Sequence, residues 1–207
     1  MARVSQAHLD ARRRQILDGA RRCFTRNGFH ATSMQDILTE ADLSAGAVYR
    51  YFRGKEDLIE AVAADAVADL RASFESALHE TPLRPLEVVV SEVMAQVLDG
   101  SHPGEETHDP RAFAKLTLQV WGETLRNESL ARTLREEYTG VMKVWCELVR
   151  RYQDAGHLRA DAPAADITRT LLAVCQGHIT QQALFGGISS QSLRDGLRAL
   201  LTSRPET

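Results

Sequence analysis

Hydrogen-bonding and cationic side chains gather between residues 33 and 55 of this 207-residue chain. Arginine and glutamine can pair with the edges of guanine and adenine, and an alanine methyl group can pack against the methyl of thymine. Hydroxyl and ammonium groups can bind phosphate oxygens. We therefore expect base contacts from Gln35, Ala45, Gly46, Ala47 and Arg50, and phosphate contacts from Ser33, Ser44, Tyr49, Tyr51 and Lys55.

Two short helices would position these side chains. Ser33 stands three residues before Asp36, a spacing typical of a helix start, because the hydroxyl can accept from first-turn amides. Ser44 follows a tight break and can cap a second helix of about two turns. On that helix Val48 and Phe52 lie four residues apart and would face inward. This order predicts a helix-turn-helix, a motif that enters the DNA major groove.

The same stretch resembles a known signature. Its pattern reads Thr32-Ser33, Asp36-Ile37, Ala41, Ser44-x-Gly46-x-x-Tyr49-x-Tyr51-Phe52-x-x-Lys55-x-x-Leu58. In this it is similar to the DNA-binding signature of the TetR family of one-component transcriptional regulators. Asp42 departs from the family's usual turn glycine, and Leu38 stands where the family often has alanine. Aspartate tolerates left-handed backbone better than most residues, so the turn should be retained.

The charge distribution agrees with a DNA-binding N-terminal segment. Residues 1–55 carry 10 Lys and Arg against 5 Asp and Glu, and the remainder carries 15 against 23. The net charges are therefore +5 and −8, although the whole chain has only −3. Arg3 and Arg12 to Arg14 can be read either as a solvated face or as contacts to phosphate or the minor groove.

Hydrophobic periodicity predicts an all-α fold of about nine helices. Besides the two short helices, we expect helices over 9–27, 55–79, 86–98, 110–126, 128–155 and 163–185, and a last one starting at Ser189 or Ser190. The helix over 55–79 contains neither proline nor glycine and is long enough to link two domains. We predict a three-helix DNA-binding domain at 1–55 and a helical bundle for ligand binding and dimerisation at 56–207.

The predicted bundle has polar groups among large apolar ones, which is where helical proteins build ligand sites. The candidates are Met94, Leu98, Phe113, Thr117, Trp121, Met142, Trp145, Cys175 and His178. For each residue taken singly, plain core packing is the favoured alternative. The resemblance implies an inducer pocket in this region without choosing its residues. The apolar and aromatic composition favours a lipophilic or aromatic effector.

The last two predicted helices carry more apolar positions than one side can bury, which suggests a partner surface. The expected interface residues are Leu171, Ile179, Leu184, Phe185, Leu193, Leu197 and Leu200. The resemblance implies that these two helices pair with their copies in a four-helix interface. A two-fold homodimer would then recognise an approximately palindromic operator on double-stranded DNA.

Neither a metal nor a cofactor is expected. His102, Glu105, Glu106, His108 and Asp109 lie in a turn-prone stretch that fixes no metal geometry, and the three cysteines are far apart. The first residues lack a signal-peptide hydrophobic region and no apolar run is long enough to span a bilayer, so we expect a cytoplasmic protein without membrane contact.

The predicted function is that of a repressor released by a small-molecule effector. An activator and a regulator without a ligand are compatible with the same residues. An all-helical enzyme fits poorly, because no nucleophile, base and orienting group recur at a recognisable spacing. A helical adaptor that binds only proteins would leave the basic motif unexplained.

Overall fold

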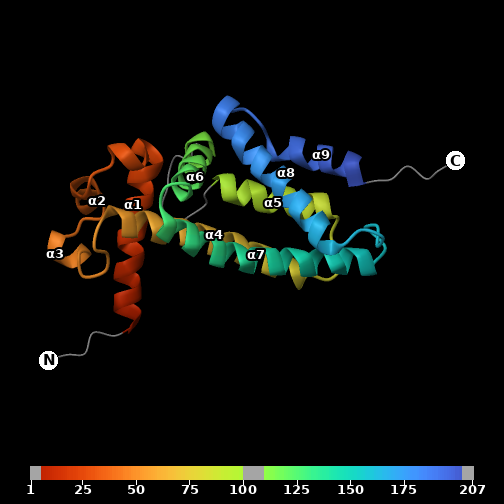
Figure 1. Cartoon of the computed structure of the whole chain (residues 1–207), viewed down its shortest axis with the longest axis horizontal. Coiled ribbons are helices and arrows are strands. Elements are labelled where there is room, and N and C mark those ends of the chain that lie inside the picture. Colours follow the sequence, from red (N-terminus) through yellow and green to blue (C-terminus); the bar gives the residue numbers. More distant parts are fainter. Residues whose placement is uncertain (1–5, 100–109, 202–207) are drawn as a thin grey trace. The chain divides into compact units, whose positions relative to one another are not determined.

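The computed structural model describes residues 6–99 and 110–201, and within them it contains nine helices and no strand. They are α1 (Gln6–Ala31), α2 (Met34–Glu40), α3 (Ala45–Val48), α4 (Lys55–Leu78), α5 (Leu86–Asp99), α6 (Pro110–Thr124), α7 (Glu128–Asp154), α8 (Ala164–Phe185) and α9 (Ser190–Leu201) (Figure 1). The all-α prediction is confirmed, and the observed bounds of α4 to α8 and the first residue of α9 lie within two residues of those predicted. Among the described helices, none has the length and apolar composition that a membrane span requires.

The chain forms two compact units. Unit 1 comprises residues 1–66 and 116–134, and unit 2 comprises 67–115 and 135–207. The unit boundaries fall inside α4, α6 and α7, so each of these helices contributes to both units. The predicted division between 1–55 and 56–207 therefore remains a proposal about which segments carry which function.

An apolar cluster fills unit 1. Ile16 of α1, Ile37 of α2, Val48 of α3 and Leu58 of α4 are all completely buried in it. Leu130 of α7, more than 70 residues further along the chain, is equally buried in the same cluster. Burying one such side chain contributes about 1.5–3 kcal/mol, so the short helices are held by this core and not by their own propensity.

A break near the C-terminal end interrupts α1. Gly28 has φ 77° and ψ 170°, a backbone conformation that is open to glycine and strained for other residues. The predicted helix stop at Asn27-Gly28 is therefore present, and a short helical turn follows it. The amide of Phe29 donates to Oε1 of Gln119 on α6 at 3.1 Å. A side chain 90 positions away thus satisfies an amide that the break releases.

Aromatic and aliphatic side chains of α4 to α9 fill unit 2. Phe74 of α4 and Trp145 of α7 are buried with ring centroids 4.2 Å apart. α9 lies along α5 (Figure 1), and it buries Leu193 and Leu197. The core of this unit therefore already uses part of the apolar surface that the sequence suggested for a partner.

Candidate nucleic-acid interface

Hydrogen bonds between Ser33 and Asp36 start α2. Oγ of Ser33 accepts from the amide of Asp36 at 3.2 Å, and the Asp36 carboxylate accepts from the Ser33 amide at 2.8 Å and from its hydroxyl at 2.7 Å. These bonds lower the pKa of Asp36. The predicted cap is confirmed and is a complete capping box. The Ser33 hydroxyl is already used within the protein, so a phosphate contact from it would require that bond to rearrange.

The turn between α2 and α3 forms as predicted, but α3 is shorter than expected. Asp42 has φ 52°, the left-handed conformation that the turn requires, and Oγ of Ser44 accepts from the amide of Ala47. The expectation of two helical turns is wrong, since α3 contains four residues. The amides of Tyr51 and Phe52 both donate to the carbonyl of Val48, which ends the helix in a tight turn.

Most of the predicted DNA contacts lie on one exposed face. Val48 is completely buried and Phe52 is 6% exposed, so the inward side of α3 is as predicted. Tyr49 is 49% exposed. The other residues that are open to solvent are Gln35, Ser44, Ala45, Gly46 and Arg50, while Ala47 and Tyr51 are half-buried. A rigid core therefore presents a small-residue helix end flanked by an arginine, a tyrosine and a glutamine.

A hollow in this face reveals one residue that the sequence reasoning missed. Its lining includes Gln35, Asp42, Ser44 and Thr39. Thr39 is exposed and its hydroxyl donates to the carbonyl of Gln35 at 2.9 Å. The spacing of four residues places Thr39 on the same side of α2 as Gln35, and this spacing was the signal that could have found it.

Lys55 has partners within the protein. Its Nζ donates to the carbonyls of Phe29 at 3.0 Å and Thr32 at 3.1 Å. The hydroxyl of Thr32 in turn donates to the carbonyl of Gly28 at 2.8 Å. Lys55 therefore closes the break at the end of α1, and at least two of its three N–H donors are turned toward the backbone.

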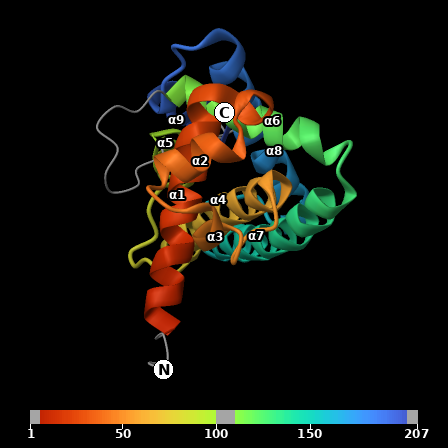
Figure 2. The same cartoon turned by 90° about the vertical axis from the view of Figure 1, so that its left-hand side faces the viewer.

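Two groups of charged side chains brace α1. Glu40 of α2 binds Arg22 at 2.7 Å and Arg26 at 3.0 Å, and these two guanidinium groups lower the pKa of its carboxyl. Arg13 lies 3.8 Å from Asp65 and stacks over the ring of Phe52 at 5.6 Å. The two contacts of Glu40 join α2 to α1, and the two helices lie side by side (Figure 2).

Comparison with known proteins identifies the family. Residues 16–62 match the model described as bacterial regulatory proteins of the tetR family, and residues 90–204, more than half of the chain, match the BetI-type transcriptional repressor C-terminal model. The HTH-type transcriptional repressor Rv1474c of Mycobacterium tuberculosis is 45% identical over 172 residues, which cover 83% of this chain and 82% of that protein. The chain belongs to the TetR family. It is therefore a DNA-binding transcriptional regulator and not an enzyme.

Further proteins resemble this chain over nearly its whole length, one in sequence and two in structure. UidR of Escherichia coli K12 is 24% identical over 95% of this chain and 94% of its own. The structure of GusR from Salmonella enterica is 26% identical, with a TM-score of 0.68 and coverage of 97% of this chain and 99% of that one. FadR from Bacillus subtilis, in complex with stearoyl-CoA, is 18% identical with a TM-score of 0.72, covering 92% and 98%.

The structure does not bring all the predicted ligand residues of this TetR-family chain into one unit. Thr117 and Trp121 are half-buried in unit 1. The other seven belong to unit 2, where Met94, Leu98, Trp145, Cys175 and His178 are buried and Phe113 and Met142 are half-buried. Burial raises the pKa of Cys175 to about 12 and lowers that of His178, so at neutral pH both carry no charge.

The predicted dimer residues fall into two groups. Leu171, Ile179, Leu193 and Leu197 are buried inside a single chain. Leu184, Phe185 and Leu200 are 57%, 74% and 80% exposed. The exposed three lie at the end of α8 and on α9, so they are the ones that remain accessible to a second copy.

The stretch considered for a metal, His102 to Asp109, and the N-terminal Arg3 lie outside the described residues. Within residues 6–99 and 110–201, no group of three or more His, Cys, Asp or Glu side chains is placed to hold a metal ion.

Proposed function

We propose that this chain is a cytoplasmic, homodimeric repressor that binds an approximately palindromic operator and is released by a small-molecule effector. The exposed face of α2 and α3 carries the proposal. Arg50 and Gln35 supply side chains that can pair with base edges, and Ala45 and Gly46 let the backbone approach the groove closely. Tyr49 and Ser44 flank them with hydroxyl groups suited to phosphate oxygens.

The arginines of α1 add to this interface. Both views show the N-terminal turns of α1 extending beyond α2 (Figures 1 and 2). Arg14 is exposed there, and Arg12 donates to Gln15 at 2.8 Å. A positive segment that extends past the reading helices is suited to phosphate or minor-groove contacts. We assign it to sequence-independent affinity.

Two buried polar atoms in unit 2 support the proposal that an effector binds there. Nε1 of Trp145 and Nε2 of His178 are buried without a hydrogen-bond partner among the described residues. Leaving a buried polar group unpaired costs about 1–3 kcal/mol, so such atoms mark positions where a ligand or a water molecule would supply the missing hydrogen bond. Both residues belong to the predicted ligand set.

The helices that both units share support the proposal that an effector releases the protein from its operator. Because α4, α6 and α7 belong to both units, a ligand that changes their packing in unit 2 acts on helices that also form the core of unit 1. A differential affinity of a few kcal/mol between two conformations suffices to empty an operator. Repression is favoured over activation because the relative Rv1474c is named a repressor.

Selection of bound duplexes from a random DNA library tests the operator. We expect a palindromic consensus, and affinity that falls steeply with salt. Arg50→Ala should then weaken binding by about 1–3 kcal/mol and relax specificity at one position in each half-site. Arg132→Ala removes an arginine of α7 that is also exposed and is the matched control. Equal losses in the two variants, or no enriched sequence, would overturn the proposal.

A further inference from the structure

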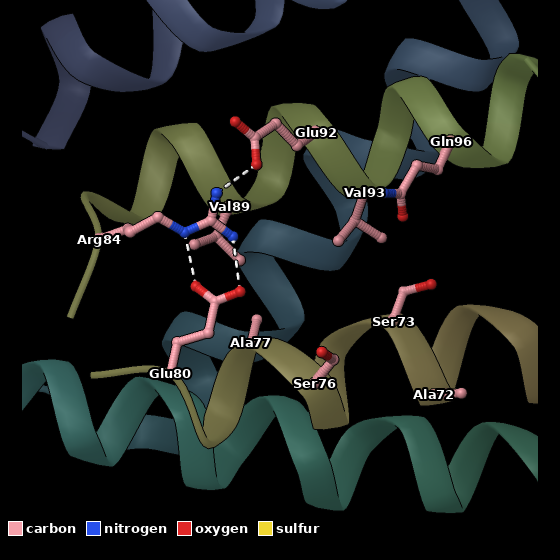
Figure 3. A pocket seen from close by; sticks show the side chains of 10 residues that line it. All are labelled: Ala72, Ser73, Ser76, Ala77, Glu80, Arg84, Val89, Glu92, Val93 and Gln96. Atoms are coloured by element: carbon pink, nitrogen blue, oxygen red, sulfur yellow. Dashed lines mark hydrogen bonds and ion pairs between the residues drawn. The ribbon is translucent and has the colours of Figure 1, made fainter. Parts of the chain in front are cut away.

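A cavity lies between α4 and α5 in unit 2, apart from the buried ligand candidates. Its volume is about 350 Å³, at the lower end of the range for small-molecule sites. Figure 3 shows Ser73 and Ser76 of α4 directed toward α5, and Val93 and Gln96 of α5 directed toward α4. The remaining lining residues are Ala72, Ala77, Glu80, Arg84, Val89 and Glu92. Both helices therefore line the cavity with a mixture of apolar and hydrogen-bonding side chains.

One end of the cavity is closed by ion pairs. Arg84 holds Glu80 through Nε at 2.5 Å and Nη2 at 3.0 Å, and its Nη1 donates to Glu92 (Figure 3). The backbone here is fixed from α7. Arg151 donates to the carbonyl of Glu80 at 2.6 Å, and the hydroxyl of Tyr152 donates to the carbonyl of Arg84 at 2.5 Å. The acidic end is therefore preorganised.

Some of the donors that line the cavity are committed within the protein, while the hydroxyl of Ser76 and the amide of Gln96 can each donate or accept. All three nitrogens of Arg84 already donate to carboxylates, and the hydroxyl of Ser73 donates to the carbonyl of Asp69 at 3.0 Å. Ser73 can then only accept from a ligand, and Glu92 binds Arg84 through one of its two carboxylate oxygens. Two carboxylates and one guanidinium give the lining a net charge of −1. This net negative charge favours a cationic ligand, and the acceptors of the lining suit one that donates hydrogen bonds.

We propose that this cavity binds a primary amine on a short aliphatic chain. The ammonium group donates to Glu92 and to the hydroxyl oxygens of α4, and the methylene groups lie on Val93 and Ala77. Such a ligand bridges α4 and α5. Since α4 also belongs to unit 1, binding would modulate operator affinity, a consequence that rests on the proposed function.

Titration calorimetry with 1,4-diaminobutane tests the site in the full-length protein. We expect the diamine to bind saturably. We expect no binding of 1,4-butanediol, which lacks the positive charge, and no binding of succinate, which is negatively charged. Glu92→Gln should weaken diamine binding at least about tenfold, because it removes a charged acceptor. Ser76→Ala should weaken it less. Glu75→Gln makes the same charge change on an exposed position of α4 outside the cavity and should bind as the parent does.

Besides an absence of diamine binding, two results would overturn the site: succinate that binds as well as the diamine, or equal diamine affinity in Glu92→Gln and Glu75→Gln. Circular dichroism of each variant verifies that the helices are intact. Operator binding without diamine, measured in parallel, separates the two proposals. Intact DNA binding with no diamine binding refutes this site alone, whereas loss of sequence-specific DNA binding in the parent protein refutes the proposed function.

Discussion

Replacing Lys55 with methionine removes the ammonium group that closes the break in α1 and keeps most of the aliphatic side chain. Two hydrogen bonds are lost, to the carbonyls of Phe29 at 3.0 Å and Thr32 at 3.1 Å. A hydrogen bond from a charged donor contributes about 1.5–3 kcal/mol, and water can replace part of this because Lys55 is half-buried. We expect a loss of about 2 kcal/mol in the free energy of unfolding of unit 1.

Thermal and urea unfolding measure that loss. For a protein of this size about 2 kcal/mol corresponds to roughly 4–8 °C in Tm. Lys143→Met, on an exposed position of α7, makes the same chemical change without those carbonyls and should leave Tm within about 1 °C of the parent. Lys55→Arg keeps the charge but not the compact ammonium group, so its Tm should lie between those of Lys55→Met and Lys143→Met.

Salt dependence of operator binding then separates a structural role from a phosphate contact. If Lys55 neutralised one phosphate in each protomer, removing both copies would reduce the slope of log K against log salt by about 1.8. The hydrogen bonds at the α1 break predict an unchanged slope with a lower Tm. A Tm equal to the parent's together with a reduced slope would refute this reasoning and would establish the phosphate contact predicted from the sequence.

Three further predictions concern packing, pH and assembly. Gly28→Ala should destabilise the fold by about 1–3 kcal/mol, because φ is 77° and the new methyl would lie 3.0 Å from Oε1 of Gln119. In a double-mutant cycle measured by urea unfolding, Gln119→Ala should lower the free energy of unfolding less in the Gly28→Ala variant than in the parent protein. Burial lowers the pKa of His178, so the folded state favours the neutral imidazole. The stability that this contributes should be fully present above the unfolded pKa of about 6.5 and should be lost as the pH falls below it. Unfolding measured between pH 5 and 8 should show a smaller loss of stability in His178→Gln than in the parent. Phe185→Glu should shift the sedimenting species from dimer to monomer. Leu125→Glu, at an 87% exposed leucine of unit 1, should leave the dimer unchanged. A Phe185→Glu variant that stays dimeric would count against an interface at this end of α8.

Local features of the DNA-binding segment could be predicted from the sequence. The cap at Ser33, the turn at Asp42, the cap at Ser44 and the inward side chains of Val48 and Phe52 are all present. Each could be predicted from the types and spacing of residues that are close in the chain, although the core that buries Val48 and Phe52 includes distant segments.

Only the tertiary structure decided which side chains are available. Lys55 fits a phosphate contact by type, but its partners lie 23 and 26 residues away. The partner of Phe29 is 90 residues away. α6 and α7 each divide between two units, so Thr117 and Trp121 lie in a different unit from Trp145. Periodicity tells which face of a helix is buried but not against which helix, because that choice depends on contacts between segments distant in the chain.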